Sequence, residues 1–450
     1  MEDTICAIST SLGVGAISII RVSGENAIEI VNNIFKGKDL TKVESHTISY
    51  GYICDGEKEV DEVLVSIMRA PKTYTLEDVV EINCHGGIST TNKVLELVLE
   101  GGARIAEPGE FTKRAFLNGR IDLTQAESVD ALLKSKSDSA RTIALNGVNG
   151  NLAKKIRNLR SILVELLANI EVNIDFPEYE DALEVTHSNL LPKLTIINDE
   201  LKDLIATARN GKILSEGLNV ALIGRPNVGK SSILNALLDE EKAIVTDIAG
   251  TTRDTVEGQA IINGILINFI DTAGIRDTED VVEKIGVDKS LATIKKCDLV
   301  ILVLNNNEEL TDEDKELLEK IKDYTNIVFI NKTDLKSKLL IDKDKYNIVN
   351  GNTKDLKGLD ELKEKIVSIS NLDKIETKDM TYLSNVRQID LAKKANKSIE
   401  HCMKNLSNEI PVDMLAIDIK QAWDLLGEII GENYQDALLD ELFTNFCLGK

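Results

Sequence analysis

The stretch Gly224-Arg225-Pro226-Asn227-Val228-Gly229-Lys230-Ser231 decides the fold of the middle of the chain. It matches the pattern GxxxxGK[ST], it directly follows the aliphatic run 220–223, and a helical run over 232–238 comes next. Glycines let backbone N–H groups close around phosphate oxygens, and the positive end of the following helix faces the same oxygens. The stretch therefore predicts a phosphate-binding loop. In it, Lys230 neutralises the β- and γ-phosphates and the Ser231 hydroxyl ligates Mg²⁺.

Two four-residue motifs follow later strand-like runs. Asp271-Thr272-Ala273-Gly274 comes after the run 265–270, and Asn331-Lys332-Thr333-Asp334 comes after the run 327–330. In the first motif the Asp carboxylate can hold the Mg²⁺ shell and the Gly N–H can sense the γ-phosphate. In the second, Asp334 can accept two hydrogen bonds from guanine, and adenine offers neither. Because α/β sheets bind ligands at the carboxyl ends of their strands, three such motifs in order predict a guanine-nucleotide site.

A hydrolytic site also needs a positioned water, and the usual residue for this task is replaced. Ras-like enzymes carry Gln directly after the Asp-x-x-Gly motif, and here that position is Ile275. Glu283 is the candidate that orients the water; its alternative interpretation is a solvated helix carboxylate. Arg253 and Arg276 are candidate arginine fingers. A bound monovalent cation, held by the side-chain oxygen of Asn227, would supply the same positive charge.

Two further loops belong to this region. Gly250-Thr251-Thr252-Arg253-Asp254 lies between the first two motifs, and Thr252 is the natural second Mg²⁺ ligand of such a segment. A guanine-stacking loop is expected near 350–358, but Asn350-Gly351-Asn352-Thr353 departs from its usual Ser-Ala pattern. The stacking contact therefore stays unassigned.

The 450-residue chain is acidic, with a formal net charge of −22, and 43% of its residues are hydrophobic. This composition predicts several packed domains and argues against a protein that coats DNA or membranes, since phosphate affinity comes from clustered Lys and Arg. The six Cys form no CxxC pair, which disfavours a zinc ribbon or a disulfide framework. No signal peptide is visible, and the longest aliphatic run, 299–304, is far shorter than the roughly 20 residues of a membrane helix. We therefore expect a cytoplasmic protein.

The hydrophobic pattern divides the chain into four segments. Residues 1–118 mix β-like runs with one helical stretch over 91–100, which predicts an α+β domain. Residues 119–212 and 379–450 carry helical patterns, and residues 213–378 alternate strand and helix. We therefore expect a multidomain α+β protein in which an α/β P-loop domain of Ras-like type is inserted into an all-α helical domain.

The first helical segment carries an apolar stripe and a set of basic residues. Residues at helical spacing on one face are Leu152, Ile156, Leu159, Leu163, Leu166 and Ile170. The basic residues expected on the other faces are Lys154, Lys155, Arg157 and Arg160. A solvated helix surface is one interpretation of these four charges. A face that meets RNA phosphates or a partner subunit is the other.

At this point the sequence resembles the MnmE (also called TrmE) family of tRNA-modification GTPases, over nearly the whole chain. The shared nucleotide-site segments are Gly224–Ser232 (GRPNVGKSS), Thr246–Asp254 (TDIAGTTRD), 271–274 and 331–334. The matching segments outside the GTPase region are more specific to the family. They are Glu107-Pro108-Gly109-Glu110-Phe111-Thr112 with 114–118, Ile174-Asp175-Phe176-Pro177-Glu178, and Phe446-Cys447-Leu448-Gly449-Lys450.

The resemblance implies a detailed nucleotide site. The implied GTP contacts are Asn227, Val228, Gly229, Lys230, Ser231, Ser232, Thr246, Asp247, Ile248, Ala249, Gly250, Thr251, Thr252, Asp271, Thr272, Ala273, Gly274, Asn331, Lys332 and Asp334. The implied Mg²⁺ ligands are Ser231 and Thr252, and the implied K⁺ ligands are Asn227, Thr246, Ile248 and Thr251. The family's catalytic Glu matches Glu283. In such enzymes two G domains meet across a dimer, and K⁺ takes the place of an arginine finger.

The N-terminal segment resembles the folate-binding domain of this family, which also forms the constitutive homodimer. The positions that match its folate ligands are Arg21, Glu81, Arg120 and Lys450. Taken alone, the first two are ordinary strand residues and the last two are surface charges. Cys447 matches a functional thiol near the folate, and its alternative interpretation is a small buried residue.

The resemblance implies a K⁺-stimulated GTPase that acts on tRNA with a separate FAD-dependent subunit of the MnmG (GidA) type, in a heterotetramer or a larger complex. Together they would place an aminomethyl or carboxymethylaminomethyl group on C5 of the wobble uridine U34. The carbon would come from a reduced folate of the 5-formyl- or methylene-tetrahydrofolate type. Two other classes stay open. An Era-like ribosome-assembly GTPase switch would need an RNA-binding appendix, and a stand-alone folate-dependent aminomethyl transferase would turn over without GTP.

Overall fold

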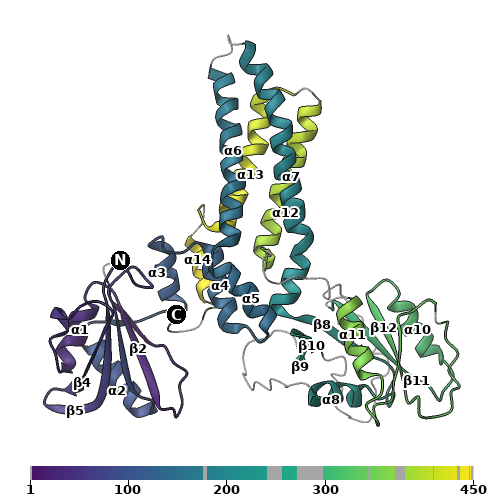
Figure 1. Ribbon diagram of the computed structural model, residues 1–450, viewed down its shortest axis with the longest axis horizontal. Coiled ribbons are helices and arrows are strands. Elements are labelled where there is room, and N and C mark those ends of the chain that lie inside the picture. The colour runs from purple at the N-terminus through teal and green to yellow at the C-terminus, as the bar shows by residue number, and fades with distance from the viewer. Residues whose placement is uncertain are drawn as a thin grey trace. The chain divides into compact units, whose positions relative to one another are not determined.

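The computed structural model describes residues 3–175, 180–240, 256–270, 297–342, 344–369, 381–408, 410–432, 436–444, 446 and 449 (Figure 1). The chain forms two compact units. The first consists of Met1–Asp130, Gly147–Asn198 and Lys394–Lys450. The second consists of Ala131–Asn146 and Asp199–Lys393.

The first unit contains a seven-stranded sheet with the strand order β3-β4-β5-β6-β2-β1-β7. The strands are β1 (Ile5–Ile8), β2 (Ile17–Ser23), β3 (Phe35–Lys36), β4 (Thr47–Asp55), β5 (Lys58–Met68), β6 (Val79–His85) and β7 (Arg104–Ile105). All neighbours run antiparallel except β1 and β7. The helices of this region are α1 (Ala27–Ile34), the 3-10 turn η1 (Leu40–Lys42), α2 (Ile88–Glu100) and α3 (Glu110–Leu117).

One face of this sheet is covered by α1 and α2, and the other is open along β4 and β5 but is covered at β1, where Phe111 packs with Ile5 and Ala7. Alternate residues of β5 point to opposite faces, so Val63 and Val65 are buried while Leu64 between them is exposed. The buried residues pack against α1 and α2 in one hydrophobic core. The predicted mixture of strands and one helix in this segment is confirmed, and the helical stretch expected over 91–100 lies within α2.

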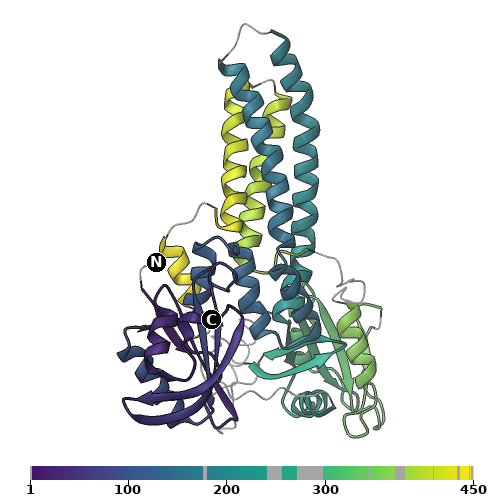
Figure 2. The ribbon, with the colours of Figure 1, turned by 60° about the vertical axis from the view of Figure 1, so that its left-hand side comes forward.

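The helices beyond the sheet are α4 (Leu123–Lys134), α5 (Asp138–Val148), α6 (Asn151–Asp175), α7 (Glu180–Glu216), α12 (Val386–Ser407), α13 (Val412–Ile430) and α14 (Asp436–Thr444). In the first unit, α6 packs along α13, although more than 230 residues separate them in the sequence (Figure 2). The predicted apolar stripe of α6 is confirmed, since all six of its residues are buried. The two helical segments of the chain therefore pack together.

The predicted basic surface on α6 is wrong for Arg160 and holds only in part for Arg157. Arg160 is 5% exposed, its guanidinium carbon lies 4.1 Å from the centre of the Trp423 ring, and it pairs with Glu432. Arg157 is half exposed and pairs with Asp122 at 3.2 Å and Glu432 at 3.9 Å. Burial lowers the pKa of Arg160, and the Glu432 carboxylate compensates the buried charge. These two arginines hold the bundle together and do not form a free basic face.

The second unit contains a six-stranded sheet with the order β13-β12-β11-β8-β10-β9. Its strands are β8 (Leu218–Ile223), β9 (Val256–Ile262), β10 (Ile265–Ile270), β11 (Leu299–Asn305), β12 (Asn326–Asn331) and β13 (Ile348–Asn350). The pairing is parallel except between β9 and β10. The helices α8 (Lys230–Glu240) and α11 (Leu359–Ile369) pack on one face and α10 (Asp312–Lys320) on the other. The four predicted strand runs are confirmed.

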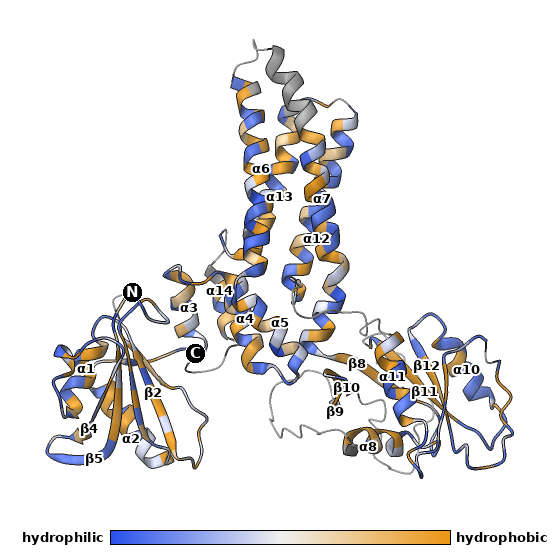
Figure 3. Ribbon diagram, viewed as in Figure 1, coloured by the Kyte–Doolittle hydropathy of each residue, from blue (hydrophilic) through white to orange (hydrophobic). Residues whose placement is uncertain are grey.

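Strands covered on both faces are nearly continuous hydrophobic runs, as parallel sheets require. Every residue of β11 is buried, and the strands of this sheet are mostly hydrophobic (Figure 3). The carboxyl ends of β8, β11 and β12 lie next to one another at one edge of the sheet. This edge carries the predicted phosphate and base motifs.

The chain enters and leaves the α/β region at neighbouring points. A Cβ atom added to Gly211, near the end of α7, would lie 2.6 Å from the Cβ of Tyr382 and 3.0 Å from the carbonyl oxygen of Leu383. Tyr382 is buried in the same core as the sheet. Only glycine fits at position 211, because any side chain there would push α7 away from the backbone at Tyr382 and Leu383.

Among the described residues, none of the helices combines the length and the apolar character needed to cross a membrane.

Candidate functional site

The phosphate-binding loop connects β8 to α8 and closes around three residues with positive φ. Gly224 has φ +143° and Gly229 has φ +105°, while Asn227 between them has φ 62°. A Cβ atom at Gly224 would lie 2.5 Å from the Val303 carbonyl oxygen, and one at Gly229 would lie 2.2 Å from Nδ2 of Asn331. Glycine at both positions is therefore required by the turn and by the neighbouring strands.

The lysine and the two serines of the predicted phosphate loop lie at the start of α8. Lys230 Nζ donates to the carbonyl oxygens of Gly224 and Arg225 at 2.6 and 2.9 Å, so the ammonium group lies across the loop. Ser231 and Ser232 are exposed in the first turn of α8. The N–H groups at this helix end carry partial positive charge, which favours an anion beside the two hydroxyls.

The base-recognition motif is attached directly to the phosphate loop. Asn331, the last residue of β12, donates from Nδ2 to the Val228 carbonyl oxygen at 2.9 Å. Lys332 has φ 60° and donates from Nζ to the Asn227 carbonyl oxygen at 3.1 Å. The Asp334 side chain is exposed, three residues after β12 ends. The two predicted motifs therefore form one continuous site.

The loop after β13, which the sequence pattern left unassigned, also joins this site. The Thr353 N–H donates to Oδ1 of Asn331 at 3.3 Å. Thr333 donates to the Gly351 carbonyl oxygen through its N–H at 3.2 Å and through its hydroxyl at 2.9 Å. A short β-branched run at 348–349 before Gly351 was the available signal for this strand and loop. The loop closes the base side of the site.

Arg225 has a role in the phosphate loop that its sequence neighbours do not indicate. Its Nε donates to Oδ1 of Asp314 at 2.9 Å and its Nη2 to Oε2 of Glu308 at 2.8 Å, and these bonds raise the pKa of Arg225. Asp314 also forms the capping box of α10 with Thr311. The start of the phosphate loop is thereby attached to the start of α10.

Several predicted residues of the nucleotide site lie outside the described residues. They are Thr246, Asp247, Ile248, Ala249, Gly250, Thr251, Thr252, Asp271, Thr272, Ala273, Gly274 and Glu283, together with the candidate arginine fingers Arg253 and Arg276.

Two of the predicted folate residues lie together on the face of the first sheet that is turned away from α1 and α2. Arg21 on β2 and Glu81 on β6 are direct partners in the strand register, and Nη2 and Nε of Arg21 lie 2.8 and 2.9 Å from Oε1 of Glu81. The guanidinium carbon of Arg21 also lies 5.7 Å from the centre of the Phe111 ring. Its Nη1 donates at 3.2 Å to the carbonyl oxygen of Gly449. The neighbours Cys447 and Lys450 lie outside the described residues.

The third predicted folate residue, Arg120, lies beside Tyr74. Its guanidinium carbon is 4.8 Å from the centre of the Tyr74 ring, and Nη1 donates to the Tyr74 carbonyl oxygen at 3.3 Å. Tyr74 packs against the cluster that contains Phe111, the residue beneath Arg21. Aromatic residues thus connect the two arginines.

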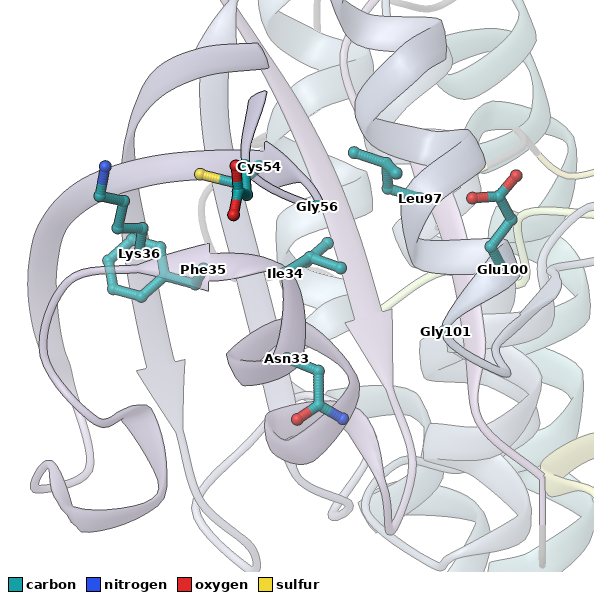
Figure 4. A pocket seen from close by; sticks show the side chains of 10 residues that line it. Asn33, Ile34, Phe35, Lys36, Cys54, Gly56, Leu97, Glu100 and Gly101 are labelled. Carbon is teal, nitrogen blue, oxygen red and sulfur yellow. The ribbon is translucent and has the colours of Figure 1, made fainter. Parts of the chain in front are cut away.

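A separate hollow of about 580 Å³ lies at the other side of this domain (Figure 4). It is lined by the end of α1, by β3, by the β4–β5 turn and by the end of α2, and includes Cys54, Leu97 and Glu100. It contains none of the predicted site residues.

A parallel sheet with this phosphate loop, joined to an Asn-Lys-x-Asp loop, defines a P-loop protein of the GTPase class. The family described as GTP-binding protein TrmE N-terminus matches residues 4–120, and the MnmE helical domain matches residues 123–447. The tRNA modification GTPase MnmE of Bacillus cytotoxicus is 52% identical over 455 residues, with 100% of this chain and 99% of the relative covered. The Bacillus subtilis relative of the same name is 51% identical, with 100% of both covered. The chain belongs to the MnmE family of tRNA modification GTPases.

Solved structures with similarity to part of the chain were also found. The G domain of the T. maritima FeoB iron transporter is 33% identical and covers 34% of this chain and 98% of its own, with a TM-score of 0.26. Aquifex aeolicus Era bound to GDP·AlF4⁻ is 26% identical and covers 40% of this chain and 66% of its own, also with a TM-score of 0.26.

Proposed function

We propose that this chain is a K⁺-stimulated GTPase that modifies C5 of the wobble uridine of tRNA together with an FAD-dependent partner subunit. The observation that carries the GTPase part is the pair of hydrogen bonds from Asn331 and Lys332 to the phosphate loop. They hold the guanine-selective carboxylate of Asp334 at a fixed distance from the phosphate-binding groups. Membership of the MnmE family supports the tRNA part.

The donor atoms of the nucleotide site fit the two proposed cations. Mg²⁺ prefers oxygen ligands, and the exposed Ser231 hydroxyl with Thr252 would supply two of them. The Asn227 side-chain oxygen would hold K⁺, together with Thr246, Ile248 and Thr251. A K⁺ ion at this position supplies positive charge that offsets the charge on the phosphates in the transition state. Glu283 is the proposed residue that orients the attacking water.

The N-terminal sheet is the proposed folate site. A pterin has neighbouring N–H groups that can donate hydrogen bonds to a carboxylate such as that of Glu81. The glutamate part of the folate carries carboxylates that Arg21 and Arg120 can bind. Arg21 and Glu81 are about one-fifth exposed and preorganised by their mutual contact. Cys447 and Lys450 would complete the site, since Gly449 between them is bonded to Arg21.

We expect Glu81→Gln to weaken binding of 5-formyltetrahydrofolate at least tenfold, because the amide would present a donor to the pterin N–H groups and would lose the charge that orients Arg21. Calorimetric titration of the full chain measures this. Glu59→Gln is the matched control, since Glu59 pairs with Lys36 at 2.8 Å on the same sheet. Equal loss in both variants, or no loss in the first, would contradict the assignment.

A homodimer is proposed through the open face of the same sheet. Ile48 and Tyr50 on β4 are 66% and 58% exposed, and Leu64, opposite Tyr50 in the register, is 46% exposed. Apolar side chains gathered on one open sheet face mark a protein interface. A second copy would cover this face with the same face of its own.

Replacing Tyr50 with Lys and Leu64 with Glu in one protein is expected to produce a monomer in sedimentation experiments. The two new charges attract across the strand pair, so the sheet itself is preserved. The control is Leu340→Glu, which changes a leucine that is 85% exposed in the other unit. A dimer of unchanged stability in the double variant would exclude this face.

Mass spectrometry of wobble-uridine nucleosides tests the whole proposal. Total tRNA from a strain that lacks this protein should contain no aminomethyl or carboxymethylaminomethyl uridine, and the wild-type gene should restore it. Complementation with Glu283→Ala or Cys447→Ser should fail, although the second variant should keep GTP hydrolysis. An unchanged amount of modified uridine in the deletion strain would refute the function and would favour the ribosome-assembly alternative.

A further inference from the structure

Asn306, in the loop after β11, holds the base-recognition segment through three of its polar groups. Its N–H donates to the Asn331 carbonyl oxygen at 2.9 Å, and its side-chain Nδ2 donates to the Leu335 carbonyl oxygen at 3.1 Å. Its own carbonyl oxygen accepts, at 2.9 and 3.2 Å, the N–H groups of Lys338 and Leu339. Asn306 belongs to none of the motifs discussed above.

These contacts enclose the turn that carries Asp334. The Leu335 N–H donates to the Lys332 carbonyl oxygen at 3.1 Å, which closes a turn over residues 332–335 with Asp334 in its third position. Asn306 holds the residue before this turn and also the residue at its end. The exposed Asp334 side chain has no other support among the hydrogen bonds found for the described residues, so its place depends on this turn.

The same loop is also attached to the phosphate end of the site. Glu308 accepts from Nδ2 of Asn305 at 2.6 Å and from Nη2 of Arg225 at 2.8 Å. Asn305 is the register partner of Asn331. The loop after β11 therefore touches both the first residues of the phosphate loop and the base-recognition turn, which fixes their separation.

We propose that Asn306 is a positioning residue for guanine selectivity, an inference that rests on the proposed binding of guanine nucleotides. Its side-chain amide holds Leu335, so that the neighbouring Asp334 carboxylate faces both N1–H and the 2-amino group of the base. Without that amide the turn keeps its backbone bonds and those of Thr333 to Gly351, but the Leu335 carbonyl oxygen, next to Asp334, loses its hydrogen bond to Asn306. The carboxylate then loses the geometry for two simultaneous hydrogen bonds.

Competition against a fluorescent GDP analogue on the full chain tests this, with GDP and inosine diphosphate as the competing nucleotides. Inosine lacks the 2-amino group, so the ratio of the two affinities reports the second hydrogen bond. Asn306→Ala should lower that ratio by about fivefold, the size of one neutral hydrogen bond. Asn306→Asp keeps the shape but cannot donate to Leu335, and it should lower the ratio by at least as much.

Asn347→Ala is the matched control. Asn347 also donates from Nδ2 to a backbone carbonyl oxygen, that of Asn326 at 3.3 Å, but at the opposite end of β12. A general loss of stability lowers both affinities in proportion and leaves their ratio unchanged, which separates positioning from folding. If the alanine variant does not fold, the ratio of affinities measured with the aspartate variant tests the proposal.

A wild-type ratio close to one would mean that the proposed guanine site itself is wrong. A clear wild-type preference for GDP that persists in both Asn306 variants would overturn this inference alone.

Discussion

Replacing Asn227 with glycine will remove the acceleration of GTP hydrolysis by K⁺ and will leave GTP affinity nearly unchanged. The side-chain oxygen of Asn227 is the proposed K⁺ ligand in the phosphate loop. Glycine deletes that oxygen but tolerates the backbone φ of 62°, and it keeps the carbonyl oxygen that accepts from Lys332. The rate in K⁺ should fall on the order of 10²-fold, as when one charge-stabilising group is removed from a transition state.

The measurement is single-turnover hydrolysis in K⁺ and in Na⁺ at equal ionic strength. The control is Asn263→Gly, because Asn263 also has a positive φ, 50°, in the turn between β9 and β10. Alanine is the poorer choice at position 227, since its side chain strains a left-handed backbone. If the glycine variant still hydrolyses GTP faster in K⁺ than in Na⁺, the cation is held elsewhere.

Exchanging Asp334 for asparagine will change the base that the protein selects. The carboxylate offers two acceptors, which suit the N1–H and 2-amino group of guanine. The asparagine amide offers one acceptor and one donor, which suit the N1–H and 2-oxo group of xanthine. Hydrogen bonds to a charged group contribute about 1.5–3 kcal/mol each, so affinity for GDP should fall on the order of 10²-fold while xanthosine diphosphate gains.

Titration of the variant with both nucleotides checks this expectation. Asp323→Asn, an exposed aspartate after α10, makes the same change of charge in the same unit and should alter neither affinity. Retained preference for guanine in the Asp334 variant would show that another group reads the base.

Local sequence patterns were enough to place most of the second sheet and the two ends of its site. The aliphatic runs that became β8, β10, β11 and β12 are buried on both faces, so composition alone marks them as strands. The phosphate loop and the Asn331 motif follow those strands directly. Each of these two motifs consists of a few adjacent residues, so it can be identified from the sequence alone.

Contacts between distant segments could not be predicted in the same way. Arg160 follows a basic run, and only its neighbours Trp423 and Glu432, more than 260 residues away, make it a buried residue. Thr353 joins the base site through one backbone N–H, which any residue possesses. Asn306 is one of three consecutive asparagines, and the sequence does not distinguish them. Asn306 contacts the base-recognition turn because β11 ends directly beside the end of β12.

The crossing of the chain at Gly211 and Tyr382 has a consequence for modularity. Because the two connections touch, the intervening 170 residues form an insertion that leaves the helical part of the chain and returns to it at a single point. The ends at 211 and 382 are therefore close enough for a short linker to join them if the intervening residues are removed. The same adjacency makes this crossing a natural place to exchange one nucleotide-driven module for another.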